Sequence, residues 1–313
     1  MKGTALNMDR SLQGSLAILF SSILWGTTGT AVTFVPDISP LGIGAFSMGI
    51  CGLLLALMAR KPLKADWSLI LQSRSALIVS VVALTVYPLA FYSSIRMAGI
   101  AVGTVVSISS APLLTVFINR LLGKENSVSF RWILSFLLGT VGIAMLTLAE
   151  SGHVALTDEN SQKLLGVLLG LVAGLSYAIY TWVAKKLINS GVKSESAMAA
   201  IFGLGACVLL PTLFFTGSNL FSTWWNAGVS LYMTLIPMFF GYLVFGFGLR
   251  HVDASKATLL TLFEPVVAAC FAVVIVGEVI TTIGWIGMML ILICLLLQAT
   301  QKTRHSSVVV RQA

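Results

Sequence analysis

The chain has 313 residues, of which 57% are hydrophobic and only 10% are charged. A soluble domain carries about 25% charged residues, so this composition excludes a soluble globular protein and indicates one that is surrounded by lipid. The formal net charge of +8 at pH 7 does not indicate a nucleic-acid-binding protein, because the basic residues are scattered over short connecting loops without a basic groove or motif.

Ten apolar runs follow one another along the chain, each close to the roughly 20 residues that a helix needs to span a bilayer. Backbone groups in lipid must be satisfied within the segment, and the alternation typical of a β-barrel is absent, so each run is predicted to be a helix. The runs are 12–35, 39–59, 75–95, 99–122, 129–149, 163–185, 195–216, 228–249, 254–276 and 282–300.

The loops between these runs predict the orientation of the chain. If the N-terminus is placed in the cytoplasm, all 19 lysine and arginine residues except Arg96 and Lys163 fall on the cytoplasmic side. Such a bias is the positive-inside signal of an inner-membrane protein. We therefore expect a multi-pass protein of the bacterial inner membrane with both termini in the cytoplasm.

The two halves of the chain repeat one pattern. Five residue pairs, one member in each half, are separated by 152 or 153 positions: Pro112 and Pro265, Glu125 and Glu278, Trp132 and Trp285, Gly14 and Gly166, Trp25 and Tyr177. Because the first half holds five spans, an odd number, the second half enters the membrane from the opposite face. The predicted fold is an all-α membrane protein of ten transmembrane helices in two inverted five-helix repeats, a plan common among secondary transporters.

This organisation predicts five segments. Two cytoplasmic tails flank the repeats and a periplasmic connector joins them. The segments are the N-terminal tail 1–11, the first repeat 12–149, the connector 150–162, the second repeat 163–300 and the C-terminal tail 301–313. In the sixth span, Gly166, Gly170 and Gly174 are spaced by four and predict a smooth face on which another helix packs closely. A monomer and a homodimer both remain open.

One stretch carries most of a family resemblance. It reads Leu249-Arg250, Ala254-Ser255-Lys256-Ala257, Leu262-Phe263-Glu264-Pro265 and Gly277-Glu278, while the first half has Ile95-Arg96, Ala111-Pro112 and Lys124-Glu125 at the matching places. Ser176-Tyr177-Ala178 and Trp25-Gly26 add to it. These motifs resemble those of the EamA-type permeases in the drug/metabolite transporter superfamily, over about residues 12–300.

The resemblance implies ten helices around a central mid-membrane cavity, alternating access and a small polar or amphipathic metabolite, often exported. One position departs from the family pattern. Many relatives have an arginine in the second span where this chain has Met48. If that arginine pairs with an acidic substrate, an anion is a less favoured substrate here.

Glu264 is the sharpest candidate site residue, since a charged group in the membrane core is costly and is rarely retained without a use. It is expected to bind an amine or take up a proton; the alternative is a hydrogen bond to a carbonyl group freed by Pro265. Pro112 and Pro265 are predicted hinges or kinks. The other predicted substrate-binding residues are polar or aromatic: Trp25, Thr28, Tyr87, Tyr92, Ser110, Tyr177, Tyr180 and Tyr242.

Aromatic faces around a cavity would suit an organic cation or an aromatic metabolite, although helix packing explains any one of these rings equally well. Tyr177 and Tyr180 are three residues apart and share a helix face. Glu125 and Glu278 lie near opposite membrane faces, where a structural loop contact is favoured over a gate.

No enzyme chemistry is predicted, since the sequence offers no nucleophile–base pair, phosphate-binding glycine loop or cluster of metal ligands. The four cysteines lie in apolar runs without a CxxC pair, so neither disulfides nor a metal site is expected. We expect no cofactor. We expect a secondary transporter that exports a small metabolite such as an amino acid or a related compound, with protons as a second candidate partner. The alternative is a non-transporting membrane sensor or assembly scaffold.

Overall fold

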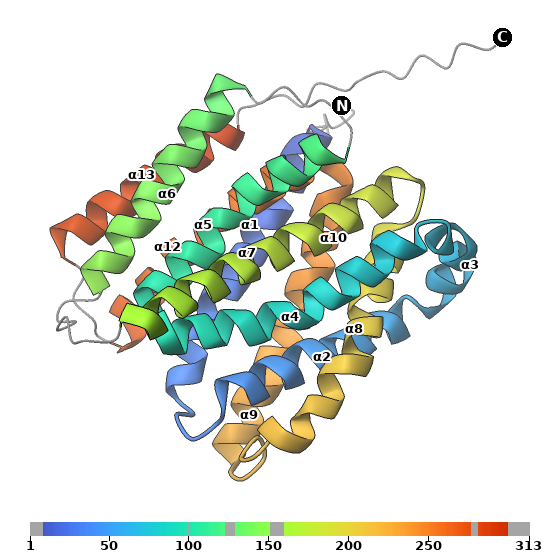
Figure 1. Ribbon diagram of the computed structural model, residues 1–313, viewed down its shortest axis with the longest axis horizontal. Coiled ribbons are helices and arrows are strands. Elements are labelled where there is room, and N and C mark those ends of the chain that lie inside the picture. The colour runs from blue at the N-terminus through green and yellow to red at the C-terminus, as the bar shows by residue number, and fades with distance from the viewer. Residues whose placement is uncertain (1–8, 99, 123–128, 151–159, 277–280, 300–313) are drawn as a thin grey trace, which may run out of the picture.

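Helices form almost the whole of the computed structural model, which describes residues 9–98, 100–122, 129–150, 160–276 and 281–299 (Figure 1). The first half contains α1 (Arg10–Thr33), α2 (Pro40–Met58), α3 (Arg60–Leu71), α4 (Arg74–Ala98), α5 (Ile100–Leu121) and α6 (Phe130–Glu150). The second contains α7 (Asn160–Asn189), α8 (Ser194–Thr216), α9 (Trp224–Met233), η1 (Thr234–Phe240), α10 (Gly241–His251), α11 (Ala254–Leu260), η2 (Thr261–Phe263), α12 (Glu264–Phe271), η3 (Ala272–Val276) and α13 (Thr282–Ala299).

Seven of these helical stretches are long and apolar enough to cross a bilayer. Three shorter apolar helices accompany them within the described part of the chain, at Val106–Leu121, Phe130–Gly142 and Thr282–Cys294. Large apolar side chains also lie on the outer surface, and Phe214 and Phe215 are each 91% exposed. A water-soluble monomer rarely exposes so much contiguous apolar surface, so the arrangement is that of a multi-pass membrane protein.

Helix α3 is an element that the sequence analysis treats as a connecting loop. Its charged residues, among them Arg60 and Lys61, resemble a loop when they are read along the sequence. On a helix they occupy one side, while Leu63 and Ile70 lie seven residues apart on the other and pack against the core. The periodicity of a short amphipathic helix was hidden by its high charge.

Prolines mark two of the places where the helices depart from α geometry. Pro237 lies inside the π-helical segment η1, which joins α9 to α10. The 3-10 turn η2 directly precedes Glu264 and Pro265, where α12 begins. Pro112, by contrast, lies inside α5 without a break in the assigned helix. The two symmetry-related prolines therefore sit in different local structures, and their use as hinges remains a prediction.

Helices of the first half pack against helices of the second. Helix α4 lies along α7, α1 along α10, α2 along α8 and α6 along α13 (Figure 1). If the halves are exchanged, the α4–α7 pair becomes the α1–α10 pair, so these contacts are consistent with a two-repeat architecture.

Helices α2 and α8, which exchange places when the two halves are exchanged, run in opposite directions. Gly42, near the start of α2, lies against Thr216 at the end of α8, while Gly52 lies against Phe202 nearer the start of α8. The missing side chain lets the two backbones approach closely. A two-fold axis perpendicular to two helices makes them antiparallel. Such an axis relates the two halves of an inverted repeat.

The main buried core lies where these pairs meet. It is built from the inner faces of α1, α2, α4, α7, α8 and α10, and its largest fully buried side chains include Tyr180, Phe202 and Phe245. A second, smaller core joins the turn after α1 to α9 through Val35, Ile38 and Met233. The candidate site lies inside the first of these cores.

Candidate functional site

Aromatic rings from both halves of the chain form one cluster in the main core. The ring of Trp25 on α1 lies 4.8 Å from that of Tyr242 on α10, and Tyr242 lies 4.4 Å from Phe202 on α8, measured between centroids. Tyr177 and Tyr180 on α7 are 5.3 Å apart. We call these five residues, together with Phe245, Tyr87, Phe91 and Tyr92, the aromatic cluster.

The first half contributes a second arm of the cluster through α4. The ring of Tyr87 lies 6.0 Å from Tyr177 and 6.1 Å from Tyr180 across the boundary between the halves. Phe91 stacks on Tyr87 at 5.8 Å, and Tyr92 meets the edge of Phe91. Tyr87 and Tyr92 are only half-buried, whereas Tyr177 and Tyr180 are buried.

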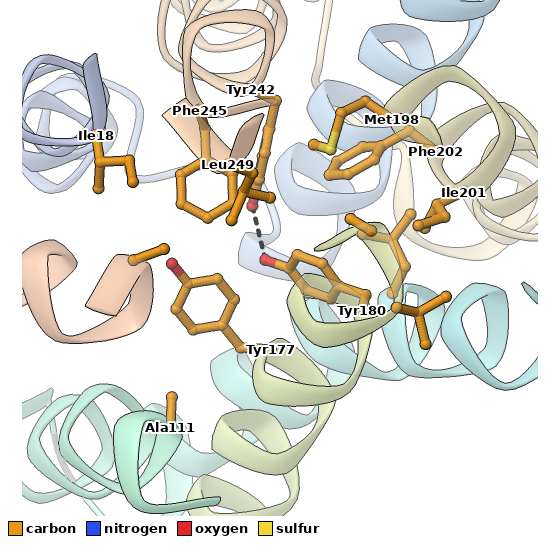
Figure 2. Packing of buried hydrophobic residues seen from close by; sticks show 14 of the residues in the cluster. Ile18, Ala111, Tyr177, Tyr180, Met198, Ile201, Phe202, Tyr242, Phe245 and Leu249 are labelled. Carbon is orange, nitrogen blue, oxygen red and sulfur yellow. Dashed lines mark hydrogen bonds between the residues drawn. The ribbon is translucent and has the colours of Figure 1, made fainter. Parts of the chain in front are cut away.

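Hydrogen bonds fix the polar atoms of the buried rings. The hydroxyl groups of Tyr180 and Tyr242 lie 3.1 Å apart and point toward each other, as Figure 2 shows. The hydroxyl group of Tyr177 donates to Thr261 Oγ1 at 3.2 Å, which ties α7 to the turn η2. Buried polar groups need such partners, and here the partners are other members of the site or its nearest neighbours.

The indole of Trp25 is fixed across the boundary between the halves. Its Nε1 donates to the carbonyl oxygen of Pro237 at 2.9 Å. In the π-helical segment η1 the amide of Gly241 donates to the carbonyl oxygens of Ile236 and Met238, and not to that of Pro237 as it would in an α-helix. Gly241 also leaves room for the ring, since a Cβ there would lie 2.8 Å from Trp25 Nε1.

Glu264 lies at the edge of the same cluster. Its carboxyl group is half-buried and close enough to interact electrostatically with the hydroxyl groups of Tyr87, Tyr92, Tyr177 and Tyr242. Among the described residues, none donates a hydrogen bond to this carboxyl group. The alternative anticipated from the sequence, a bond from the protonated carboxyl group to a carbonyl freed by Pro265, stays a prediction.

The backbone of α1 positions Glu264 beside the aromatic rings. A Cβ added to Gly26 would lie 2.9 Å from the Glu264 carbonyl oxygen and 2.7 Å from the Cβ of Val267. Helix α12 can therefore pack this closely only against a glycine, one residue after Trp25. The Trp25-Gly26 pair thus serves both the ring contact and the approach of the helix that carries the carboxyl group.

Two predicted residues make contacts within or between helices rather than with the aromatic rings. The hydroxyl group of Thr28 donates to the Trp25 carbonyl oxygen of its own helix at 2.7 Å. Ser110 donates to the Ser107 carbonyl oxygen at 3.3 Å and packs against Gly174 of α7. Pro112 and Pro265 are both buried. Glu125 and Glu278 lie outside the described residues.

Four members of this neighbourhood were not singled out by sequence reasoning. Phe91, Phe202 and Phe245 look like ordinary core residues in apolar runs, and only the tertiary structure brings them to the tyrosines. Pro237 did carry a signal, since it is a proline within a predicted span, like Pro112 and Pro265. It could have been recognised by the same argument.

Chemically, the site offers aromatic faces, hydroxyl groups and one carboxyl group. Such a set can bind an organic cation or an aromatic compound through its rings and can exchange a proton at the carboxyl group. Rings from the two halves touch directly, so a molecule that binds among them would contact α1 and α4 on one side and α7 and α10 on the other.

Comparison with protein families gives a match in each half of the chain. The model of the EamA-like transporter family matches residues 12–148 and again residues 164–300. The two matches cover nearly all the described helices and separate at the segment between α6 and α7.

Relatives along the whole length are transporters by name. The Uncharacterized transporter YwfM of Bacillus subtilis (strain 168) is 31% identical over 306 residues, which cover 94% of this chain and 98% of that protein. The Uncharacterized inner membrane transporter YicL of Salmonella typhimurium is 21% identical, over 96% of this chain and 99% of that protein.

The fold also occurs among solved structures. One crystal structure superposes with a TM-score of 0.74 at 17% sequence identity, covering 91% of this chain and 95% of that chain. At this identity the likeness concerns the fold alone.

Proposed function

This chain belongs to the EamA-like transporter family, and from that premise we propose that it is a secondary transporter that works by alternating access. Its substrate is a small polar or amphipathic metabolite, such as an amino acid or a related compound, and the direction is export. The ten spans form two inverted repeats, with both termini in the cytoplasm of a bacterial cell.

The observation that carries this proposal is the aromatic cluster shared by the two halves. Trp25 of the first half touches Tyr242 of the second, and Tyr87 of the first touches Tyr177. Rocking of one half against the other would open these contacts from one side at a time, which is how inverted-repeat transporters give access to a site near the midplane. The antiparallel α2–α8 pair supports such an arrangement of the halves.

Glu264 gives the proposed site its selectivity. A carboxyl group without a hydrogen-bond donor among the described residues has its acceptor oxygens free for a ligand. An ammonium group at this position would lie within reach of the surrounding tyrosine rings as well, whose faces attract cations. We therefore favour substrates with an amino group, with proton exchange at Glu264 as the coupled event.

The test is counterflow in proteoliposomes. Candidate compounds are first found by thermal stabilisation of the purified protein over amino acids, amines and sugars. Counterflow of a labelled hit through the wild-type protein is expected, and Glu264→Gln is expected to reduce it at least tenfold and to remove its dependence on pH. Asp66→Asn, which removes a carboxyl group outside the cluster, is the matched control and should leave transport unchanged.

Two results would contradict the proposal. Absence of counterflow for every stabilising compound would argue against transport by this protein. Full activity with an unchanged pH profile in Glu264→Gln would show that the protein transports without a role for the Glu264 carboxyl group. A substrate that carries no amino group, and that the wild-type protein and Glu264→Gln bind equally, would likewise refute the selectivity argued for Glu264.

A further inference from the structure

A cavity of about 440 Å³ lies between α2, α3, α8 and α10, apart from the aromatic cluster. Its volume falls in the range of small-molecule sites, roughly 300–1,000 Å³. Met198 of α8 separates it from the cluster, since this side chain lines the cavity and lies beside Phe202 in Figure 2. Its walls are Leu55, Met58, Ala59, Pro62, Ser194, Glu195, Met198, Leu243, Val244, Phe247 and Arg250.

The walls of this cavity change from charged to apolar along one direction. Arg250 lies in the last turn of α10 and Glu195 in the first turn of α8, so both charges lie where membrane helices end. Leu243 precedes Arg250 by seven residues on α10, about 10 Å deeper at 1.5 Å per residue. The cavity therefore has a charged end at the level of the helix ends and an apolar wall that runs into the membrane.

The two charges at the helix ends are not paired with each other. Glu195 accepts a hydrogen bond from the Ser194 hydroxyl group at 3.3 Å, and within the described ranges neither Glu195 nor Arg250 forms an ion pair. Opposite charges that line one cavity without meeting favour a ligand that carries both charges. A purely anionic ligand would be repelled by Glu195 and a purely cationic one by Arg250.

We propose that this cavity binds a glycerophospholipid with a phosphoethanolamine headgroup. The phosphate group contacts the guanidinium of Arg250, which suits phosphate oxygens geometrically. The ammonium group donates hydrogen bonds to Glu195, and an acyl chain lies along Leu243, Val244 and Phe247. A phosphocholine headgroup has no N–H donor for Glu195, and a phosphoglycerol headgroup has no cation, so both fit less well.

The experiment is native mass spectrometry of the full-length protein, freed of lipid and then offered equimolar phosphatidylethanolamine, phosphatidylcholine and phosphatidylglycerol with identical acyl chains. We expect phosphatidylethanolamine to be retained several-fold more than the other two. Arg250→Gln should lower the retention of all three lipids. Glu195→Gln should abolish the preference for phosphatidylethanolamine over phosphatidylcholine. Arg74→Gln, an exposed arginine at the start of α4, is the control and should behave as the wild type.

A second variant tests the cavity without altering its charges. Leu243→Trp fills the apolar wall and should reduce lipid retention, whereas Phe214→Trp on the exposed surface of α8 should not. The proposal is overturned if the wild type retains the three lipids equally, if it prefers phosphatidylglycerol, or if the Arg250, Glu195 and Leu243 variants all bind as their controls do. None of these readouts depends on transport, so the inference stands or fails separately from the proposed function.

Discussion

Close packing of α6 on α13 predicts that Gly142→Ala destabilises the protein. A Cβ at position 142 would lie 2.6 Å from the Gly287 carbonyl oxygen and 3.1 Å from the amide nitrogen of Ile291. Ordinary contacts begin at 3.4 Å, so the backbones must separate by about 0.8 Å, which weakens every van der Waals contact along the pair. Both obstructing atoms belong to the backbone and cannot rotate away.

The magnitude follows from two opposing effects. Overpacking of a core costs roughly 1–3 kcal/mol, and alanine is favoured over glycine in a helix by about 0.8–1 kcal/mol. Subtracting the second effect from the first leaves a net loss of roughly 0–2 kcal/mol. Gly29→Ala on α1 isolates the second effect, because no atom lies within 4 Å of the added Cβ.

The assay is unfolding of the purified variants in mild detergent, followed by helix content. Gly142→Ala should unfold at a lower temperature than the wild type, and Gly29→Ala at the same or a higher temperature. If Gly142→Ala proved as stable as Gly29→Ala, the close approach of α6 and α13 would be wrong.

Three further substitutions test individual hydrogen bonds. Trp25→Phe removes the donor to the Pro237 carbonyl oxygen and should cost about 0.5–2 kcal/mol of stability, measured by the same unfolding assay. Tyr180→Phe leaves a buried tyrosine hydroxyl group without its partner; it should cost about 1–3 kcal/mol, and an unchanged unfolding temperature would contradict the contact. Asn226→Ala breaks the 2.8 Å bond to Asp37 that joins the α1–α2 turn to α9; we expect a similar loss, accompanied by faster proteolysis at that turn.

The sequence by itself determined that the chain is a helical multi-pass membrane protein and that its two halves repeat one pattern. These features depend on composition and on periodic or duplicated patterns, which lipid enforces because every backbone polar group must be satisfied within its own helix. Glu264 could be chosen for the same reason, since a carboxyl group in an apolar run is costly wherever the run packs. Helix α3 was missed because its amphipathic periodicity is short and carries many charges.

Only the tertiary structure decided which rings meet. Tyr177 and Tyr180 share a helix face that is visible in the sequence, but their contacts with Tyr87 and Tyr242 depend on how α7 packs against α4 and α10. The same is true of the cavity beside Arg250, whose walls come from four helices. Apolar helices in lipid can pair in many ways by composition alone. The choice rests on close contacts at particular glycines, whose spacing in the sequence indicates a packing face but not which helix packs there.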